Sequence, residues 1–591
     1  MANLRRLRMK GLSLIVMLTF VITVVLGYMP NVQPIKGDWT GTIYIKSDGS
    51  IYPTNAPIDT NDNVTYTLKS NILSSANGIV VQRSHVIING AGLLLQGSGG
   101  VSTNGIFLDS VANVTIKNML IRNFGTGIRC EYSSYNVMKN LKITGNAFGI
   151  YLVFSSRNNT IIDDEITHNE ETGIWISGDS HGSIVIRNNI TNNENGISLG
   201  SSNNIIGENN IISNKIGLDM HSWPERASYN RVYNNIFIGN GIWVVGLYAN
   251  SVDGNLVNGK PLVYLEDASN YTVSEAGQVV LINCDRIKIE GLNLSCATIG
   301  VQLIGTKNSM ITRNYITGNS HYGIRLINSF NNLIAGNEII GNGEYSIWLL
   351  ESPNNVIELN KIESNKVGVY IYHCSYNRIY HNNFIRNQIQ AMISASGYIN
   401  YWDDGYPSGG NYWSNYLVID KKSGVNQDES GSDGIVDSWY TFSHDCVDHY
   451  PLMGMLFYFN ATSEFHVQII CNSSISHFRV NGNTITFNVT DGSGANGFCR
   501  ICIPTALMNM PYEVFVDGVK VSYSLLQFSN ETHNYIYFSY THPAHEVQIV
   551  PEYASLLFLF QPLFMTFVLR TLKIWWDHRD LNKIRRNAPV G

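Results

Sequence analysis

Two adjacent carboxylates and a nearby histidine are the residues of this chain whose types and spacing best suit catalysis. Asp163 and Asp164 are neighbours, and His181 follows in the next stretch of similar sequence. A pair of carboxyl groups is what hydrolysis of a glycosidic bond requires. Arg286 and Lys288, which would complete a cleft, are too far along the chain to join them. The competing interpretation is that Asp163 and Asp164 replace asparagine at turns.

A second acidic group lies in a segment with little secondary-structure signal. Asp428, Asp433 and Asp437 surround two glycines there. Oxygen-rich loops that contain an Asp-Gly turn resemble calcium sites, although the spacing is not that of an EF-hand. We expect either calcium bound by these three aspartates or a solvated turn.

Soft metal ligands gather just after this loop. His444, Cys446 and His449 are close in sequence, and copper or zinc sites are built from such clusters. The alternative is that all three are ordinary polar loop residues. Cys499 and Cys502 have C-x-x-C spacing, but residues three apart on a strand face opposite sides, so this pair is a poor metal clamp.

These candidates are embedded in a repeat of about 22 residues. Its copies have the form N-x-I-x-x-N-x-I-x-x-N-x-x-G-I-x-L and extend from residue 78 to residue 396, with degeneration between about Gly241 and Ala297. Apolar and polar residues alternate over very short runs, which indicates strands. Asn and Gly between these runs tolerate left-handed backbone at tight corners.

Three short strands and three corners per repeat predict one turn of a right-handed parallel β-helix. Inward Ile, Val and Leu, such as Ile150, Ile174 and Ile197, should stack from coil to coil, and corner asparagines should form amide ladders. A leucine-rich horseshoe has a similar period but needs a helical half-repeat, which is missing. Residues 454–551 change to longer alternating strands with a hairpin signal at Asp517-Gly518, which predicts a small β-sandwich.

The coils resemble the NosD-like β-helix proteins, also described as carbohydrate-binding and sugar-hydrolase repeats. The resemblance continues into the segments N-Y-W-D-D at 400–404, G-G-N-Y-W-S-N-Y at 409–416 and D-H-Y-P-L at 448–452, which look like the Trp/Asp-rich cap of archaeal surface proteins. It implies an extracytoplasmic β-helix that binds carbohydrate or builds the envelope. The NosD name also implies copper handling.

Both ends of the chain carry apolar runs. Basic residues at 5–10 precede an apolar stretch that ends at Gly27, which is typical of a secretion signal or an N-terminal anchor. A second apolar run is followed by basic residues up to Arg586, which is typical of a membrane anchor with a cytoplasmic tail. N-x-S/T sequons such as those at Asn63 and Asn530 agree with a glycosylated body outside the cytoplasm.

Charge excludes one class of function. Only 14% of residues are charged and the net charge is −6, so nothing suggests nucleic-acid binding.

From the resemblance and the two apolar ends, we expect a secreted, membrane-anchored protein at the cell surface that binds a glycan or serves as an envelope component. The alternatives are a polysaccharide lyase, hydrolase or epimerase acting along the coils, and copper handling. The predicted division is 1–27 signal or anchor, 28–77 N-terminal strands, 78–396 β-helix, 397–453 cap, 454–551 sandwich, 552–574 anchor and 575–591 tail.

Overall fold

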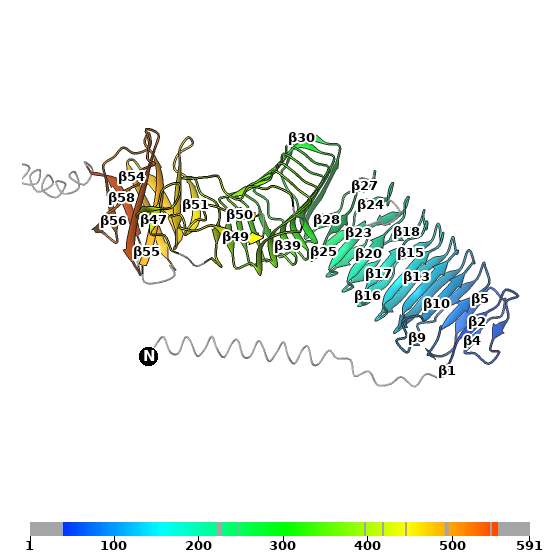
Figure 1. The fold of residues 1–591 in the computed structure, drawn as a ribbon. Helices are drawn as coiled ribbons and strands as arrows, with labels where there is room; N and C mark the ends of the chain where they lie inside the picture. The colour runs from blue at the N-terminus through cyan, green and yellow to red at the C-terminus, as the bar shows by residue number, and fades with distance from the viewer. Residues whose placement is uncertain are drawn as a thin grey trace, which may run out of the picture. The chain divides into compact units, whose positions relative to one another are not determined.

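A computed structural model describes residues 39–220, 227–246, 249–394, 397–416, 419–443, 446–490, 496–543 and 546–552 (Figure 1). Every element bounded within these ranges is a β-strand. The predicted N-terminal signal and basic tail lie outside the described residues, as does the predicted anchor except for its first residue. Across the described ranges, no helix is long and apolar enough to cross a bilayer. The chain divides into two compact units, residues 1–170 and 171–591.

The first unit is a stack of parallel coils. One wall consists of β2 (Ile43–Ile45), β7 (Ile79–Val81), β10 (Asn104–Asp109), β12 (Thr126–Glu131) and β14 (Phe148–Val153). Equivalent residues of successive coils are paired in register, for example Ile106, Ile128 and Ile150. This register confirms the predicted β-helix repeat.

The long strands β11 (Thr115–Arg122) and β13 (Val137–Thr144) run through both other walls of this unit. They pair on one wall with β8 (Ile87–Asn89) and β15 (Thr160–Ile162), and on the other with β9 (Leu94–Gly97) and β16 (Glu165–Thr167). Earlier coils add β5 (Thr65–Leu68), β6 (Ile72–Ser74) and β1 (Trp39–Thr40). Two short antiparallel strands, β3 (Ile51–Tyr52) and β4 (Ile58–Asp59), pair with β2 and β5.

The second unit begins with coils that have three separate walls. The first is β17 (Thr172–Ile176), β20 (Asn195–Leu199), β23 (Ile216–Met220) and β26 (Ile242–Val244). The second is β18 (Ile184–Ile186), β21 (Ile205–Gly207), β24 (Arg231–Tyr233) and β27 (Ser251–Asp253). The third is β19 (Asn189–Thr191), β22 (Asn210–Ile212), β25 (Ile236–Ile238) and β28 (Leu256–Val257).

The coil pattern is interrupted where the repeat degenerates. Strand β28 turns back into the antiparallel strand β29 (Lys260–Glu266), with Val257 opposite Lys260. The side-chain amide of Gln278 completes the edge of β26, because it accepts from the Ile242 N–H at 2.8 Å and donates to the Ile242 carbonyl at 2.6 Å. The degenerate stretch therefore marks a real break between two blocks of coils.

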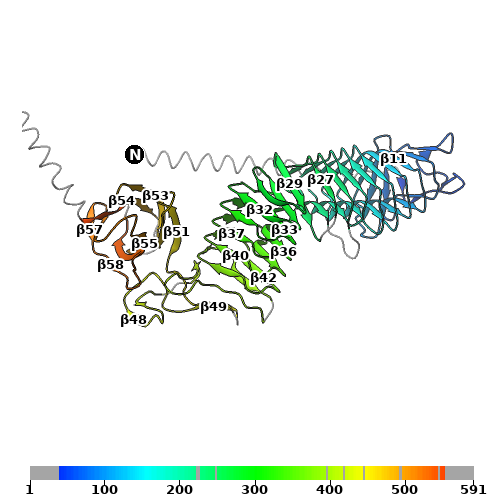
Figure 2. The same cartoon turned by 90° about the horizontal axis from the view of Figure 1, so that it is seen from above.

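The second block again has three walls, and strands of the first two are labelled in Figure 2. The first is β29, β31 (Gln278–Ile282), β33 (Ile299–Ile304), β36 (Tyr322–Ile327), β39 (Tyr345–Leu350), β42 (Val367–Tyr372) and β45 (Ile389–Ile393). The second is β30 (Ser269–Val273), β32 (Asp285–Glu290), β34 (Met310–Thr312), β37 (Leu333–Ala335), β40 (Val356–Glu358) and β43 (Arg378–Tyr380). The third is β35 (Tyr315–Thr317), β38 (Glu338–Ile340), β41 (Lys361–Glu363), β44 (Asn383–Ile385) and β46 (Tyr412–Trp413).

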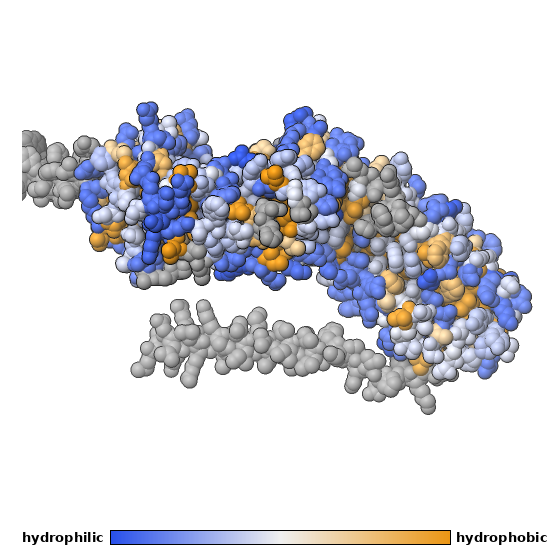
Figure 3. Space-filling model, viewed as in Figure 1, coloured by the Kyte–Doolittle hydropathy of each residue, from blue (hydrophilic) through white to orange (hydrophobic). Residues whose placement is uncertain are grey.

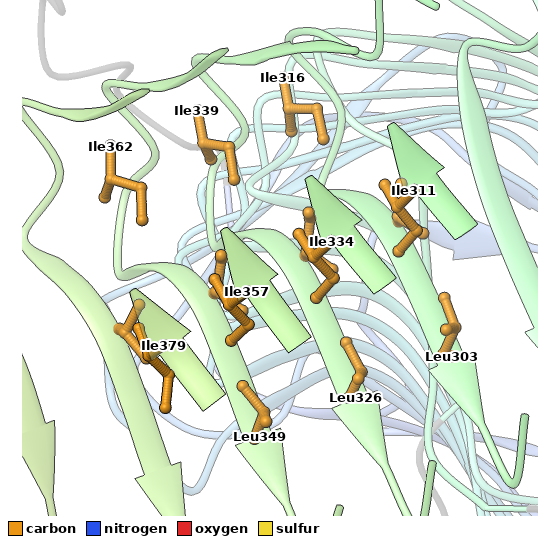
Figure 4. Close-up of a cluster of buried hydrophobic side chains, with 14 of the residues drawn as sticks. Leu303, Ile311, Ile316, Leu326, Ile334, Ile339, Leu349, Ile357, Ile362 and Ile379 are labelled. Atoms are coloured by element: carbon orange, nitrogen blue, oxygen red, sulfur yellow. The ribbon is translucent and has the colours of Figure 1, made fainter. Parts of the chain in front are cut away.

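Inward apolar side chains form continuous rows in this block. Figure 4 shows three such rows, represented by Ile316 and Ile339, by Ile334 and Ile357, and by Leu326. Burying matched side chains over several coils supplies most of the favourable free energy of such a fold. In the space-filling view, apolar side chains form small groups on a largely hydrophilic surface (Figure 3).

Buried asparagines form the predicted amide ladders at the corners. The Asn314 side-chain amide donates to Asn337 Oδ1 at 3.0 Å, and Asn337 donates in the same way to Asn360 at 2.9 Å. Each of these oxygens also accepts the backbone N–H of the preceding ladder residue. The ladders therefore satisfy corner backbone groups that strand pairing leaves open.

A cap closes the last coil. Trp402 and Trp413 are each 1% exposed, and Trp413 stacks on Phe384 with ring centroids 4.4 Å apart. The buried Asp448 carboxylate accepts from the Trp413 indole N–H and the Asn411 backbone N–H, both at 2.8 Å. The cap also contains β47 (Lys422–Ser423), β48 (Glu429–Ser430), β49 (Tyr440–Ser443) and β50 (Cys446–Asp448).

The C-terminal part is a sandwich of two antiparallel sheets that share one apolar core. One sheet is β51 (Met455–Asn460), β52 (His466–Cys471), β55 (Asn496–Pro504), β59 (His533–Thr541) and β58 (Ser524–Leu525). The other is β53 (Ser474–Asn481), β54 (Thr484–Thr490), β60 (Glu546–Pro551), β56 (Tyr512–Val516) and β57 (Val519–Val521). The predicted fold class, a parallel β-helix followed by a β-sandwich, is confirmed.

Candidate binding face

The two predicted catalytic carboxylates occupy a corner of the first unit. Asp164 is buried, and its Oδ1 accepts the Leu141 N–H at 2.7 Å. Asn159 makes the equivalent contact with the Asn136 N–H at 2.9 Å, so Asp164 stands where the repeat has a ladder asparagine. Burial raises the pKa of Asp164 to about 8. Asp163 is exposed with φ of 57°, as expected for a corner residue.

The predicted histidine belongs to the second unit. His181 Nδ1 lies 3.1 Å from Asp179 Oδ1. The corner position of Asp164 accounts for its burial and its hydrogen bond without a catalytic role. Catalysis by Asp163, Asp164 and His181 stays a prediction.

The three predicted calcium ligands have different surroundings. Asp433 is fully buried and accepts the Ile435 N–H at 3.0 Å, whereas Asp437 accepts the backbone N–H groups of Lys421 and Lys422. Asp428 contributes a backbone carbonyl at 3.4 Å from Lys422 Nζ. Across the described ranges, no three His, Cys, Asp or Glu side chains gather as a metal-binding group. Calcium at this loop stays a prediction.

Sequence reasoning missed two charged neighbours of this loop. Asp420 is half-buried and accepts the N–H groups of Asp433 and Gly434, and burial raises its pKa to about 7. Arg500, from the sandwich, is buried and interacts electrostatically with Asp433. A buried arginine from a distant strand therefore supplies positive charge to this loop.

The predicted soft-metal cluster is not assembled by its described members. His444 lies outside the described residues. Cys446 is 2% exposed and packs in the apolar core of the coils. His449 is exposed, and its Nδ1 lies 2.9 Å from Asp403 Oδ2. Cys446 and His449 therefore face different environments, and copper or zinc at this place stays a prediction.

A different feature distinguishes the outer surface of the coils, namely the variable residue of each G-I-x-L motif. This residue points outward from the first wall, and in the second block successive coils place Gln302, Arg325, Trp348 and Tyr370 in register there. In the first unit the same position holds Phe107, Arg129 and Tyr151. Aromatic and basic side chains thus recur at a position that the repeat leaves free to vary.

Aromatic rings form a continuous run over the coils of the second block. We call this run the aromatic face. Tyr322 stacks on Tyr345 with ring centroids 5.5 Å apart, and Tyr345 stacks on Tyr370 at 4.9 Å. The run extends to Trp243 at one end and to a further stack at the other. Its members are Trp243, Tyr322, Tyr345, Trp348, Tyr370, Tyr372, His373 and Tyr398.

A buried arginine is clamped inside the aromatic face. The Arg325 guanidinium lies 4.9 Å from the ring centroid of Trp348 and 5.3 Å from that of Trp243. Its Nη1 donates to the Val244 carbonyl at 2.9 Å, which joins the second block of coils to the first. Burial lowers the pKa of Arg325 to about 10, so it remains charged at neutral pH and supports a cation–π arrangement.

Several ionisable groups border this arginine. His321 is 4% exposed, and its ring lies 4.9 Å from that of Trp243. Burial lowers the pKa of His321, with Glu344 acting in the opposite direction. Burial also raises the pKa of Tyr322, and Glu344 adds to that rise. A histidine, a tyrosine and a glutamate near a fixed cation are groups that can exchange protons with a ligand.

Donor groups on this face remain without protein partners. Among the described residues, Trp243 Nε1, Arg325 Nε and Trp348 Nε1 have no hydrogen-bond acceptor. An unsatisfied buried donor costs free energy that a ligand or solvent oxygen would recover. All three atoms are buried, so what the face offers at its surface is its half-buried rings and not these donors. The variable position of the motif, which holds Trp348 and Tyr370, was a sequence signal for part of this face.

The coils match the model of a known protein family. A family model described as "Periplasmic copper-binding protein (NosD)" matches residues 54–246 and 241–418. No curated protein matches the chain.

The chain also has low similarity to several solved structures. The pectate lyase Pel9A has 15% identity and a TM-score of 0.27, covering 43% of this chain and 69% of its own. The DFA-IIIase from Arthrobacter chlorophenolicus A6 has 11% identity and a TM-score of 0.27, covering 59% and 72%. The A-module of the mannuronan C-5 epimerase AlgE4 from Azotobacter vinelandii has 16% identity and a TM-score of 0.23, covering 56% and 90%.

Proposed function

Because this chain belongs to the NosD family, we propose that it works outside the cytoplasm as a carbohydrate-binding β-helix protein. The observation that carries the proposal is the run of stacked rings from Tyr322 through Tyr345 to Tyr370. Each ring belongs to a different coil, so the run follows the axis along which coils repeat, about 4.8 Å at a time. An extended polymer of similar repeat could lie along it.

The chemistry of the aromatic face suits a sugar chain. Sugar rings have apolar C–H faces that pack on aromatic rings and hydroxyl groups that need polar partners. Trp348 and Tyr370 are half-buried, so each presents part of a ring to solvent. The fixed position of Arg325 between two indoles keeps the rings in place before a ligand arrives, which reduces the entropic cost of binding.

Membrane attachment completes the proposal. The apolar run followed by basic residues near the C-terminus would anchor the protein and leave the coils outside the cell. The description of the family as periplasmic supports an extracytoplasmic location. The alternative is that the protein is a structural component of the envelope and binds no glycan.

Catalysis on the same face is a second candidate. Glu344 lies close enough to His321 and Tyr322 to affect the pKa values of both, and such groups supply general acids and bases in polysaccharide lyases, hydrolases and epimerases. This proposal differs from the sequence-predicted site at Asp163, Asp164 and His181. It requires turnover of a bound polysaccharide.

Copper handling finds less support in the described residues. Copper sites use clustered His, Cys or Met side chains. Within the ranges that the structure describes, no group of three His, Cys, Asp or Glu residues is placed to hold a metal. Of the proposed ligands that the structure describes, Cys446 packs in the apolar core and His449 lies beside Asp403, so we assign no step to copper.

One experiment separates binding from turnover. The purified chain is incubated with an array of neutral and uronate-containing polysaccharides, and bound protein is measured alongside release of reducing ends or unsaturated products. Trp348→Ala and Tyr370→Ala should weaken binding. Tyr315→Ala is a matched control, because Tyr315 is 45% exposed on a different wall of the same coils. Equal binding by all three variants and the parent chain would refute the proposal.

A further inference from the structure

Two cysteines in the sandwich face each other across neighbouring strands. Cys471 on β52 is the register partner of Cys499 on β55. Their sulfur atoms lie 3.3 Å apart. Both side chains are fully buried, and both are thiols in this structure.

The surroundings hold the two sulfurs in place. The Ser473 backbone N–H donates to Cys471 Sγ at 3.4 Å, and Tyr540 Oη lies 3.4 Å from the same sulfur. Tyr540 in turn donates to Ser473 Oγ at 2.9 Å. The pair sits within the apolar core shared by the two sheets.

The geometry suits a covalent bond. Residues directly opposite in an antiparallel pair have Cβ atoms about 4.5–5.5 Å apart, close to the separation that a disulfide spans. The sulfurs need to approach only from contact distance to the disulfide length of about 2.05 Å. Small rotations of the two side chains provide this movement.

We propose that Cys471 and Cys499 form a structural disulfide when the chain is exported. The oxidant is an extracytoplasmic protein disulfide that meets the chain before the sandwich closes. One thiol loses its proton and attacks that disulfide to give a mixed disulfide, and the second thiolate then displaces the oxidant's sulfur. Two electrons and two protons leave the cysteines, and the oxidant departs as a dithiol.

The bond would stabilise the sandwich mainly by restricting the unfolded chain. It closes a loop that contains β53 and β54, which belong to the opposite sheet. Crosslinks of this kind lower the conformational entropy of the unfolded state. Small domains outside the cytoplasm commonly use them.

The neighbouring Cys502 provides an internal control. It completes the C-x-x-C spacing with Cys499, yet its register partner on β52 is Gln468. Residues three apart on a strand face opposite sides, so Cys502 is directed away from the Cys471 pair. The proposed disulfide therefore joins Cys471 to Cys499 and not Cys499 to Cys502.

Peptide mapping of the full chain tests this assignment without any variant. The chain is exported to the oxidising periplasm of a bacterial host, denatured in an alkylating agent, digested without reduction and analysed by mass spectrometry. We expect a linked peptide containing Cys471 and Cys499, about 2 Da lighter than the sum of the two thiol peptides, together with alkylated Cys502. The same chain kept in a reducing cytoplasm should yield alkylated Cys471 and Cys499. Alkylation of both residues in the exported protein would overturn the proposal.

A stability measurement provides the second readout. Reductant should lower the melting temperature of the exported parent chain and of Cys502→Ser by several degrees. Cys471→Ser and Cys499→Ser should melt lower and be insensitive to reductant. A reductant effect of equal size in Cys471→Ser and the parent chain would contradict the disulfide. Neither readout depends on polysaccharide binding, so failure of the proposed function would leave this result unaffected.

Discussion

The indole ring of Trp348 stacks on the phenol ring of Tyr322, with ring centroids 5.4 Å apart and 16° between their planes. The two residues belong to the neighbouring strands β39 and β36, and in register Tyr322 is opposite Tyr345. Trp348 therefore leans diagonally across the wall, and the Arg325 guanidinium lies 4.9 Å from its ring. This arrangement gives the aromatic face a fixed surface, and its consequences can be measured.

Removal of one ring should weaken polysaccharide binding without unfolding the coils. Trp348→Ala and Tyr370→Ala each delete a stacking surface worth about 1 kcal/mol, which corresponds to about a fivefold loss in affinity. Affinity electrophoresis or calorimetry with the polysaccharide selected on the array provides the measurement. Tyr315→Ala should retain the parent affinity, and a similar loss in that variant would point to a nonspecific effect.

A charge inside the coils should destabilise the second unit. Ile174 is fully buried and pairs in register with Ile197 on the next coil. Ile174→Asp would bury an unpaired carboxylate and cost several kcal/mol, which thermal unfolding followed by circular dichroism would detect. Ser198→Asp, at the outward position of the neighbouring strand, should change the melting temperature little. Equal stability of Ile174→Asp and the parent chain would contradict the stacking.

Asp164 should make the first unit less stable as pH rises. Its folded-state pKa of about 8 exceeds the value of about 3.9 for an unfolded aspartate. The first unit therefore has its full stability below pH about 4, where Asp164 is protonated in the folded and the unfolded chain. The free energy of unfolding falls progressively as the pH rises to about 8. Asp164→Asn keeps a neutral ladder residue, so it should raise the melting temperature at pH 9, by a free energy on the order of a few kcal/mol, and change it little at pH 4.

The exposed neighbour of this residue is the control for that titration. The charge of Asp163 contributes to the raised pKa of Asp164, so Asp163→Asn should reduce the pH dependence of melting without removing it. If the melting curve of Asp164→Asn depends on pH in the same way as that of the parent chain, a buried neutral Asp164 is excluded.

Calcium should stabilise the cap if Asp428, Asp433 and Asp437 act as ligands. A cation that binds only the folded state stabilises it by about 2.7 kcal/mol at a hundredfold excess over Kd. We expect a higher melting temperature in calcium than in chelator, and loss of this difference in the double variant Asp433→Asn, Asp437→Asn. Identical melting in calcium and chelator would leave the loop as a hydrogen-bonded turn built around Asp420.

The orientation of the chain can be tested on intact cells. Protease added outside should digest the coils and sandwich and leave a protected fragment that contains Arg579, because basic residues after an apolar span stay in the cytoplasm. Immunoblotting with an antibody against the C-terminal tail provides the measurement. A body that resists protease until the cells are lysed would exclude an external location.

The sequence alone determined the fold, because the β-helix is built from local repetition. Each coil needs the same inward Ile and the same corner Asn as its neighbours, so a period of about 22 residues predicts both the apolar rows and the amide ladders. The ladder from Asn314 through Asn337 to Asn360 follows directly from that spacing. The break near Gly241 was also visible as degeneration of the repeat.

The tertiary structure decided which side chains meet when they are far apart in sequence. Arg325 reaches the carbonyl of Val244, Arg500 of the sandwich interacts with Asp433 of the cap, and Cys471 meets Cys499. These partners depend on how coils, cap and sandwich pack, and local periodicity contains no information about that packing. Candidate sites chosen by residue type and spacing therefore differed from the aromatic face, whose rings are contributed by several coils.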